Sequence, residues 1–246
     1  MSVTSPEELD RLRIIGRIVR RALDVMAAAV RPGATTEELN RIGARVLAEH
    51  GAEPSPPKVY GFPGAVCISV NDEAVHGIPG ERVLHPGDLV KLDVVAEKGG
   101  VLADAAVTVG VGPLRGSAEA IVDCAERAFR QAARVARAGA RISEIGRAVT
   151  LEATRRGFHV MPELGGHGVG RTIHEAPSVP NYPDPDSRAR LTEGLVITIE
   201  PIIAAGTGRG LLDPNGWTVR TADGSLSAHY EHTLVITRDA PILLTA

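Results

Sequence analysis

The sequence has few of the residues that mark several common classes of protein. Its two cysteines, Cys67 and Cys124, are too few for a disulfide framework, and their spacing matches no zinc motif. Aromatic residues make up only 3% of the chain, which leaves few rings on which nucleic acid bases could stack, and the net charge of -3 suggests no polyanion-binding surface. The most apolar early run, residues 25–30, is too short to span a bilayer, and arginines interrupt any secretory leader. We therefore expect a cytoplasmic protein that binds neither nucleic acid nor a membrane.

A pattern of two helices followed by strands is present instead, and it occurs twice in the 246 residues. The first helix is expected to start at Ser5-Pro6, with Glu8 completing a capping box, and to stop at Pro32-Gly33. The rest of the first half is expected to form a helix, a proline-rich loop and three strands, at about 35–51, 54–63, 66–70, 89–95 and 102–111. The second half is expected to form a helix at about 117–138, a second helix that ends at 157, and two strands at about 195–203 and 230–237.

Residue matches support an internal duplication. Residues 31–34 (R-P-G-A) match 137–140 (R-A-G-A), residues 89–93 match 196–200, and after an insertion residues 103–107 match 230–234. We predict one catalytic domain over 1–246, made of two pseudo-symmetric halves at about 1–112 and 113–246.

The duplication places two carboxylates of each half in apolar strands, namely Asp93 and Asp104, then Glu200 and Glu231. Any one of them could be a surface acid or an ion-pair partner, because acidic residues are mostly exposed. Four carboxylates at repeat-related positions are better explained if their side chains meet where the two halves of the domain pack together. Converging carboxylates cannot all stay ionised without cations, and they suit two divalent ions ~3.5–4 Å apart.

Histidines offer candidate nitrogen ligands. His167 lies in Gly165–Gly170, where glycines let the backbone approach closely; the alternative is an ordinary glycine-rich turn. One histidine among four carboxylates favours manganese, iron(II) or cobalt over a structural zinc site. His76 and His174 are either loop histidines or members of the site. The remaining histidines are interpreted as ordinary residues, and His232 is excluded because strand neighbours face opposite sides; they are His50, His85, His159, His229 and His232.

Seven short motifs follow one another in a specific order. They are G-F-P-G-A-V-C-I-S-V-N from Gly61, V-H-G-I-P at His76, K-L-D-V at Asp93, G-G-H-G-V-G at His167, I-H-E at His174, T-I-E-P at Glu200 and S-A-H-Y-E-H-T at Glu231. Together they resemble the type I methionine aminopeptidases of the pita-bread metallopeptidase family, over nearly the whole chain. The resemblance implies an α/β fold with a curved antiparallel sheet and helices on its outer face.

The resemblance also implies a reaction centre with two divalent metal ions, which could be cobalt, manganese, iron or zinc. Asp104 and Glu231 would bridge the ions, Asp93 would hold one, and His167 with Glu200 would hold the other.

Further residues would then bind the substrate and assist the reaction. A water or hydroxide would attack the scissile carbonyl while Glu200 assists proton transfer. His174 would stabilise the oxyanion, and His76 would contact the scissile nitrogen or the residue beyond it. The residues that would line the methionine pocket are Phe62, Cys67 and Trp217.

The implied substrate is the N-terminus of a nascent polypeptide with a small second residue, the ribosome is a second candidate partner, and a monomer is expected. The chain departs from the family pattern at Val59, Ile173, Gly165 and Ala105-Ala106, of which the first two affect the pocket and hence fine specificity. Two rivals remain: a relative that cleaves Xaa-Pro bonds, and a non-catalytic module that binds protein or RNA.

Overall fold

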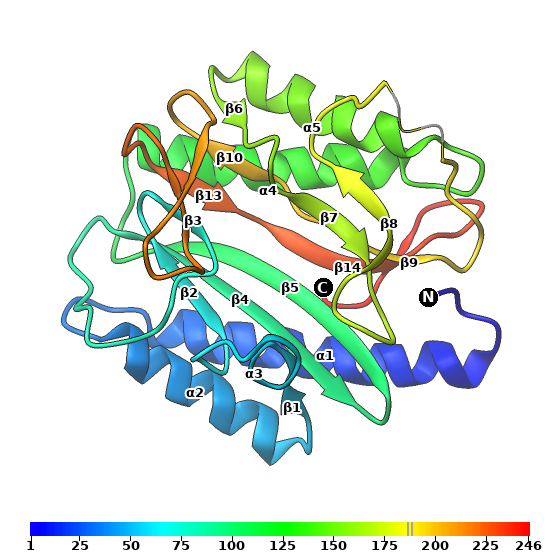
Figure 1. The fold of residues 1–246 in the computed structure, drawn as a ribbon, viewed down its shortest axis with the longest axis horizontal. Helices are drawn as coiled ribbons and strands as arrows, with labels where there is room; N and C mark the ends of the chain where they lie inside the picture. Colours follow the sequence, from blue (N-terminus) through cyan, green and yellow to red (C-terminus); the bar gives the residue numbers. More distant parts are fainter. Residues whose placement is uncertain (186, 188) are drawn as a thin grey trace.

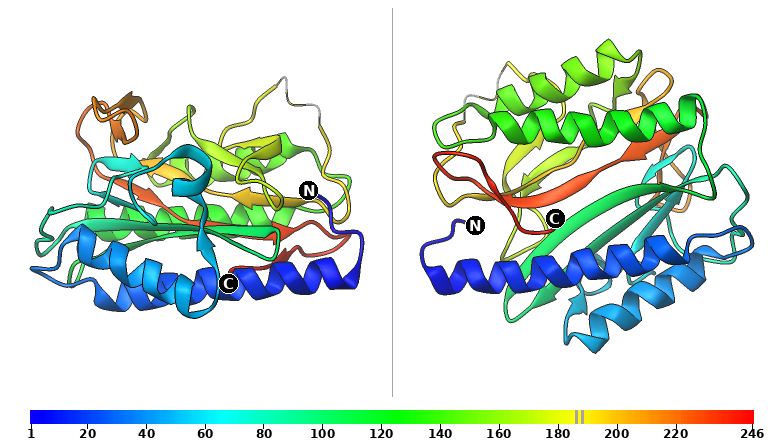
Figure 2. Two further views of the ribbon diagram at one scale, coloured as in Figure 1. Left: turned by 60° about the horizontal axis from the view of Figure 1, so that its bottom comes forward. Right: turned by 180° about the vertical axis from the view of Figure 1, so that it is seen from behind.

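Two pairs of helices cover one face of a curved sheet. The computed structural model describes residues 1–185, 187 and 189–246. The helix pairs are α1 (Pro6–Ala29) with α2 (Thr36–Glu49), and α4 (Ser117–Val135) with α5 (Ile142–Arg155). They lie on opposite sides of the central strands in Figure 1, and the rear view in Figure 2 shows both pairs over the same face of the sheet. This confirms the predicted α/β fold with outer helices.

The central sheet carries nine strands, in the order β1-β4-β5-β14-β9-β7-β8, with β2 paired to β4 and β15 to β14. All of its pairings are antiparallel. The strands are β1 (Glu53–Pro54), β2 (Cys67–Val70), β4 (Leu89–Lys98), β5 (Val101–Gly110), β7 (Gly165–Gly168), β8 (Glu175–Pro180), β9 (Val196–Ile199), β14 (Glu231–Val235) and β15 (Ile242–Leu243). The pairing of β5 with β14 joins the two halves of the chain at the middle of the sheet.

Two small sheets have the orders β13-β10-β6 and β11-β12-β3. Their strands are β3 (Glu73–Val75), β6 (His159–Val160), β10 (Ile202–Ala204), β11 (Gly210–Leu212), β12 (Val219–Thr221) and β13 (Ser227–His229). The element order repeats as helix, helix and strands, in agreement with the proposed duplication, which stays a prediction.

Local sequence explains where the helices begin. The Ser5 and Thr35 side chains accept hydrogen bonds from the third residue after each, Glu8 and Glu38, and so cap α1 and α2. The Glu8 carboxylate bonds the Thr4 amide rather than that of Ser5, so the reciprocal half of the predicted capping box is shifted by one residue.

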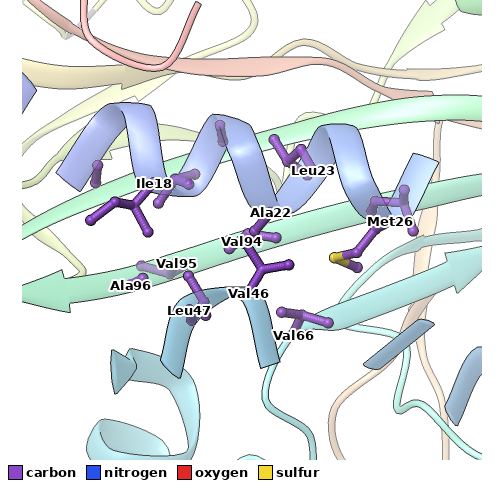
Figure 3. Packing of buried hydrophobic residues seen from close by; sticks show 14 of the residues in the cluster. Ile18, Ala22, Leu23, Met26, Val46, Leu47, Val66, Val94, Val95 and Ala96 are labelled. Atoms are coloured by element: carbon purple, nitrogen blue, oxygen red, sulfur yellow. The ribbon is translucent and has the colours of Figure 1, made fainter. Parts of the chain in front are cut away.

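Apolar faces of the helices then bury against the sheet. Figure 3 shows Ile18, Ala22 and Met26 of α1 packed with Val46 of α2 and Val94 of β4. A second cluster packs α4 and α5 against β9 and β10. Within the described ranges, none of the helices combines the length and the apolar character that crossing a bilayer needs.

Two elements differ from the expectation. The segment predicted as a proline-rich loop contains a short helix, α3 (Ser55–Tyr60), because prolines are tolerated in the first helical turn; Gly61, at φ 72°, ends it. The single strand predicted over 195–203 is broken after Ile199, because Pro201 has no N–H to donate to a ladder. The chain bends there from the central sheet into the small sheet, and it bends back at Tyr230, between β13 and β14.

Candidate metal centre

All ten residues proposed from the sequence as site residues line one cavity of about 280 Å³. The cavity lies where the central sheet meets the two small sheets. The ten residues are Phe62, Cys67, His76, Asp93, Asp104, His167, His174, Glu200, Trp217 and Glu231.

Strand register explains why three of the carboxylates face this cavity. Ala106 of β5 is paired with Asp93 on one side and with Glu231 on the other. Directly paired residues share a face of the sheet, and so do residues two apart on a strand, which adds Asp104 to the same face. Glu200 follows the last residue of β9, at the bend, and it also lines the cavity. Convergence of the four carboxylates therefore follows from register and from the bend.

Without a cation, burial disfavours the ionised forms of the four carboxylates. Burial raises the pKa of Asp93 to about 6 and that of Glu200 to about 7, and burial together with the neighbouring carboxylates raises the pKa values of Asp104 and Glu231 well above their usual range. Among the described residues, Asp93 Oδ1, Asp104 Oδ1 and Glu231 Oε1 are buried without a hydrogen-bond partner. Orphaned carboxylate oxygens of this kind fit divalent cations, which are hard acids that prefer oxygen ligands.

His167 presents one nitrogen to this cluster. Its Nδ1 lies 2.9 Å from the Gly168 carbonyl, which holds the proton on Nδ1 and leaves the Nε2 lone pair free. Nε2 lies 3.7 Å from Glu200 Oε1 and 3.8 Å from Asp104 Oδ2, too far for hydrogen bonds but close enough to share an ion.

Glycines beside His167 permit close backbone packing, as expected. A side chain at Gly166 would meet the Thr198 carbonyl oxygen at 2.4 Å, and one at Gly168 would meet the Ala176 carbonyl oxygen at 2.3 Å. The Thr198 hydroxyl also accepts a hydrogen bond of 3.1 Å from the His167 amide. Larger residues at 166 or 168 would push β7 away from its neighbours and move the imidazole.

His174 and His76 lie at the exposed rim of the cavity. The rings of His174 and His167 are 4.2 Å apart between centroids. His76 has a φ of 56°, which is rare for a residue with a side chain, and its carbonyl accepts a hydrogen bond from the Thr218 hydroxyl. Both histidines are therefore placed beside the carboxylates rather than among them.

Tyr60 is a cavity residue that the sequence reasoning missed. Its hydroxyl lies 2.6 Å from His174 Nδ1. Val59, where the chain departs from the family pattern, is 50% exposed, whereas the neighbouring Tyr60 lines the cavity and provides a tyrosine there. The turn of α3, which was predicted as a loop, decides which of these two side chains faces inward.

The candidate side-chain pocket is apolar. Phe62 and Trp217 pack edge to face, with centroids 5.3 Å apart at 83°. Cys67 is buried opposite Asp93, and its thiol stays neutral because burial and the carboxylates raise its pKa. Ile173 and Ile202 complete the apolar lining, so the pocket favours an uncharged, flexible side chain.

His229 was interpreted as an ordinary histidine, and that interpretation is wrong about its location. The residue lines the cavity, its side chain is 2% exposed, and Nε2 lies 3.5 Å from Glu200 Oε2 and from Glu231 Oε2. The available signal was its position two residues before Glu231, which predicts the same face. His232 faces away, bonded to Thr245 and Tyr230, as expected.

Comparisons with known proteins agree with this geometry. The model of metallopeptidase family M24 matches residues 10–238. Methionine aminopeptidase 2 of Bacillus subtilis is 45% identical over an alignment of 247 positions, covering 100% of this chain and 99% of the relative. Crystal structures of methionine aminopeptidases from Rickettsia prowazekii and Thermotoga maritima both superpose with a TM-score of 0.96, at 33% and 32% identity, covering the whole of this chain and at least 99% of theirs. The chain therefore belongs to metallopeptidase family M24 and, within it, groups with the methionine aminopeptidases.

Proposed function

We propose that this protein removes the N-terminal methionine from polypeptides whose second residue is small, by hydrolysis of the peptide bond with two divalent metal ions. The observation that carries the proposal is the group of buried, unpartnered carboxylate oxygens facing His167, beside an apolar pocket that fits a thioether.

Five residues would hold the metal. Asp104 and Glu231, on neighbouring strands, are proposed to be shared by two ions, with Asp93 on one ion and His167 and Glu200, 3.7 Å apart, on the other. Bound divalent ions would lower the pKa of a water molecule and polarise the scissile carbonyl. The mixed oxygen and nitrogen donors fit manganese, iron(II), cobalt or zinc.

Glu200 is proposed to move the proton during the reaction. A carboxylate held beside the attacking water can accept its proton and then return it. Glu200 would take the proton of the attacking water and pass it to the departing amine. The Thr198 hydroxyl, which donates a hydrogen bond to Glu200 Oε1, orients the carboxylate.

His174 is proposed to donate a hydrogen bond to the oxygen that gains negative charge. Burial raises the pKa of Tyr60, so the phenol keeps its proton and donates it to His174 Nδ1. That hydrogen bond leaves the imidazole proton on Nε2, which becomes the donor. His76, across the rim, would contact the scissile nitrogen or the following residue.

The pocket of Phe62, Cys67 and Trp217 would select the methionine side chain, since the thioether is apolar and flexible. Nascent chains in the cytoplasm are the source of substrate that fits this specificity. We propose that the enzyme meets them as a monomer, with the ribosome as the candidate docking partner.

The experiment compares three peptides, Met-Ala-Ser, Met-Lys-Ser and Ala-Pro-Ala, after chelation and reconstitution with each of the four metals in turn. We expect cleavage of Met-Ala-Ser to be much faster than that of Met-Lys-Ser, and no cleavage of Ala-Pro-Ala. Equal rates on the two methionine peptides would contradict the proposal. Faster cleavage of Ala-Pro-Ala would favour the Xaa-Pro rival, and inactivity with every metal would favour a binding module.

A further inference from the structure

His229 has a buried ring nitrogen with no partner. Among the described residues, its Nε2 is the one histidine nitrogen that is buried and makes no hydrogen bond. The backbone of His229 is fixed, because Thr108 Oγ1 lies 2.8 Å from both its amide nitrogen and its carbonyl oxygen. On this anchored backbone, the ring nitrogen Nε2 faces the carboxylates of Glu200 and Glu231. A buried polar atom in such a position calls for a ligand.

The distances around Nε2 suit a shared ion better than a hydrogen bond. Nε2 is 3.5 Å from Glu200 Oε2 and 3.5 Å from Glu231 Oε2, whereas N–H···O bonds in proteins are about 2.7–3.2 Å long. Two donor atoms that each lie about 2.1 Å from a tetrahedral metal ion are roughly 3.4 Å apart. The observed spacing is therefore close to the edge of a ligand set.

Glu200 lies between two histidines. Its Oε1 is 3.7 Å from His167 Nε2, and its Oε2 is 3.5 Å from His229 Nε2. The donor atoms accordingly form two groups that share Glu231: one with Asp104 and His167, the other with Glu200 and His229.

We propose that His229 is a sixth metal ligand, whose Nε2 binds an ion together with the carboxylates of Glu200 and Glu231. This inference rests on the proposed two-metal centre and extends it by one residue. An added nitrogen donor shifts the preference of that ion toward zinc, cobalt and iron and away from manganese.

The test measures coordination directly. The metal-free protein is titrated with Co²⁺ by calorimetry, and proton NMR of the loaded protein counts the shifted N–H signals of cobalt-bound imidazoles. We expect two such signals in the wild type and one in His229→Gln, with binding of one ion weakened by about 10–100-fold or more, since even loss of an outer-sphere partner costs that much. Glutamine can still donate a hydrogen bond, so unchanged binding and two signals in His229→Gln would overturn the proposal.

His232→Gln is the matched control. It changes a histidine three residues away that is also buried but bonds Thr245 and Tyr230 on the other side of the strand. It should keep both signals and both affinities. Should His229→Gln fail to fold, X-ray absorption of the wild type with two zinc ions decides: one imidazole per ion on average supports the proposal, and one per two ions overturns it.

Peptide cleavage is measured on the same preparations, which separates this inference from the proposed function. Two imidazole signals in a protein that does not cleave Met-Ala-Ser would support the ligand and contradict the activity. Cleavage of Met-Ala-Ser by a protein with one imidazole signal would support the proposed activity and overturn the proposal that His229 is a ligand.

Discussion

The hydrogen bond between Tyr60 and His174 offers a sharp test of how this site would stabilise negative charge. If the Tyr60 hydroxyl sets the tautomer of His174, then Tyr60→Phe should act only through the imidazole. The hydroxyl lies 2.6 Å from Nδ1, and among the described residues it makes no other hydrogen bond. Tyr60→Phe removes this one group and keeps the ring that packs 5.7 Å from His174.

The expected magnitudes follow from the contacts. A neutral hydrogen bond contributes about 0.5–1.5 kcal/mol, which is roughly 2- to 12-fold in kcat. Tyr60 is 47% exposed, so water can partly replace the hydroxyl, and the loss should lie in the lower part of that range. His174→Ala removes the proposed oxyanion donor itself and should cost about 10²–10³ in kcat.

A double-mutant cycle on Met-Ala-Ser connects the two changes. Tyr60→Phe should lower kcat with little change in KM, and the same substitution in a His174→Ala background should have no further effect. Metal content and melting temperature are measured on each sample, and both should stay at wild-type values. A full additional loss from Tyr60→Phe in the absence of His174 would refute the positioning role, and loss of metal in His174→Ala would make that residue a ligand.

Three further results are expected. Asp104→Ala should abolish turnover and lower metal content while the circular dichroism spectrum is kept, because a bridging ligand is removed; near wild-type turnover would exclude the two-metal centre. In the metal-free protein, Asp93 and Glu200 should contribute stability at pH 5 that is lost by pH 7.5, because their raised pKa values let the folded state bind protons that the unfolded chain has released, while the lowered pKa values of His76, His229 and His232 act in the opposite direction. Glu200→Gln should therefore raise the melting temperature of the metal-free protein more at pH 7.5 than at pH 5, and an equal shift at both pH values would contradict that reading. Lys91→Met should lower the free energy of unfolding in urea by about 1–3 kcal/mol, because the buried ammonium donates to the Ser227 carbonyl and hydroxyl, which would lose that donor; an unchanged midpoint would show that water takes its place.

Local patterns were enough to predict the four long helices, the central strands β2, β4, β5, β9 and β14, and the five candidate ligands, but not α3 or most of the short strands. Capping residues such as Ser5 and Thr35 act within one turn, and an acid in a run of apolar residues is visible without any coordinates. The order of the motifs carried the family resemblance for the same reason, since each motif is contiguous in the chain.

Bends and neighbours from distant segments were not visible in this way. The break at Pro201 places Glu200 between two sheets, so that each of its oxygens faces a different histidine. In one continuous strand over 195–203, the Glu200 side chain would point to a single face of one sheet.

The two missed residues, Tyr60 and His229, show the same limit. Each is an ordinary residue in its own segment, and each gains its place from a partner more than a hundred positions away: His174, just before β8, for Tyr60, and Thr108 of β5 for His229. Sequence spacing reports which side chains share a face of one element. Which of them end within a few ångströms of a common point depends on register, on twist and on the path of the chain between elements, because these are set by packing across the whole core.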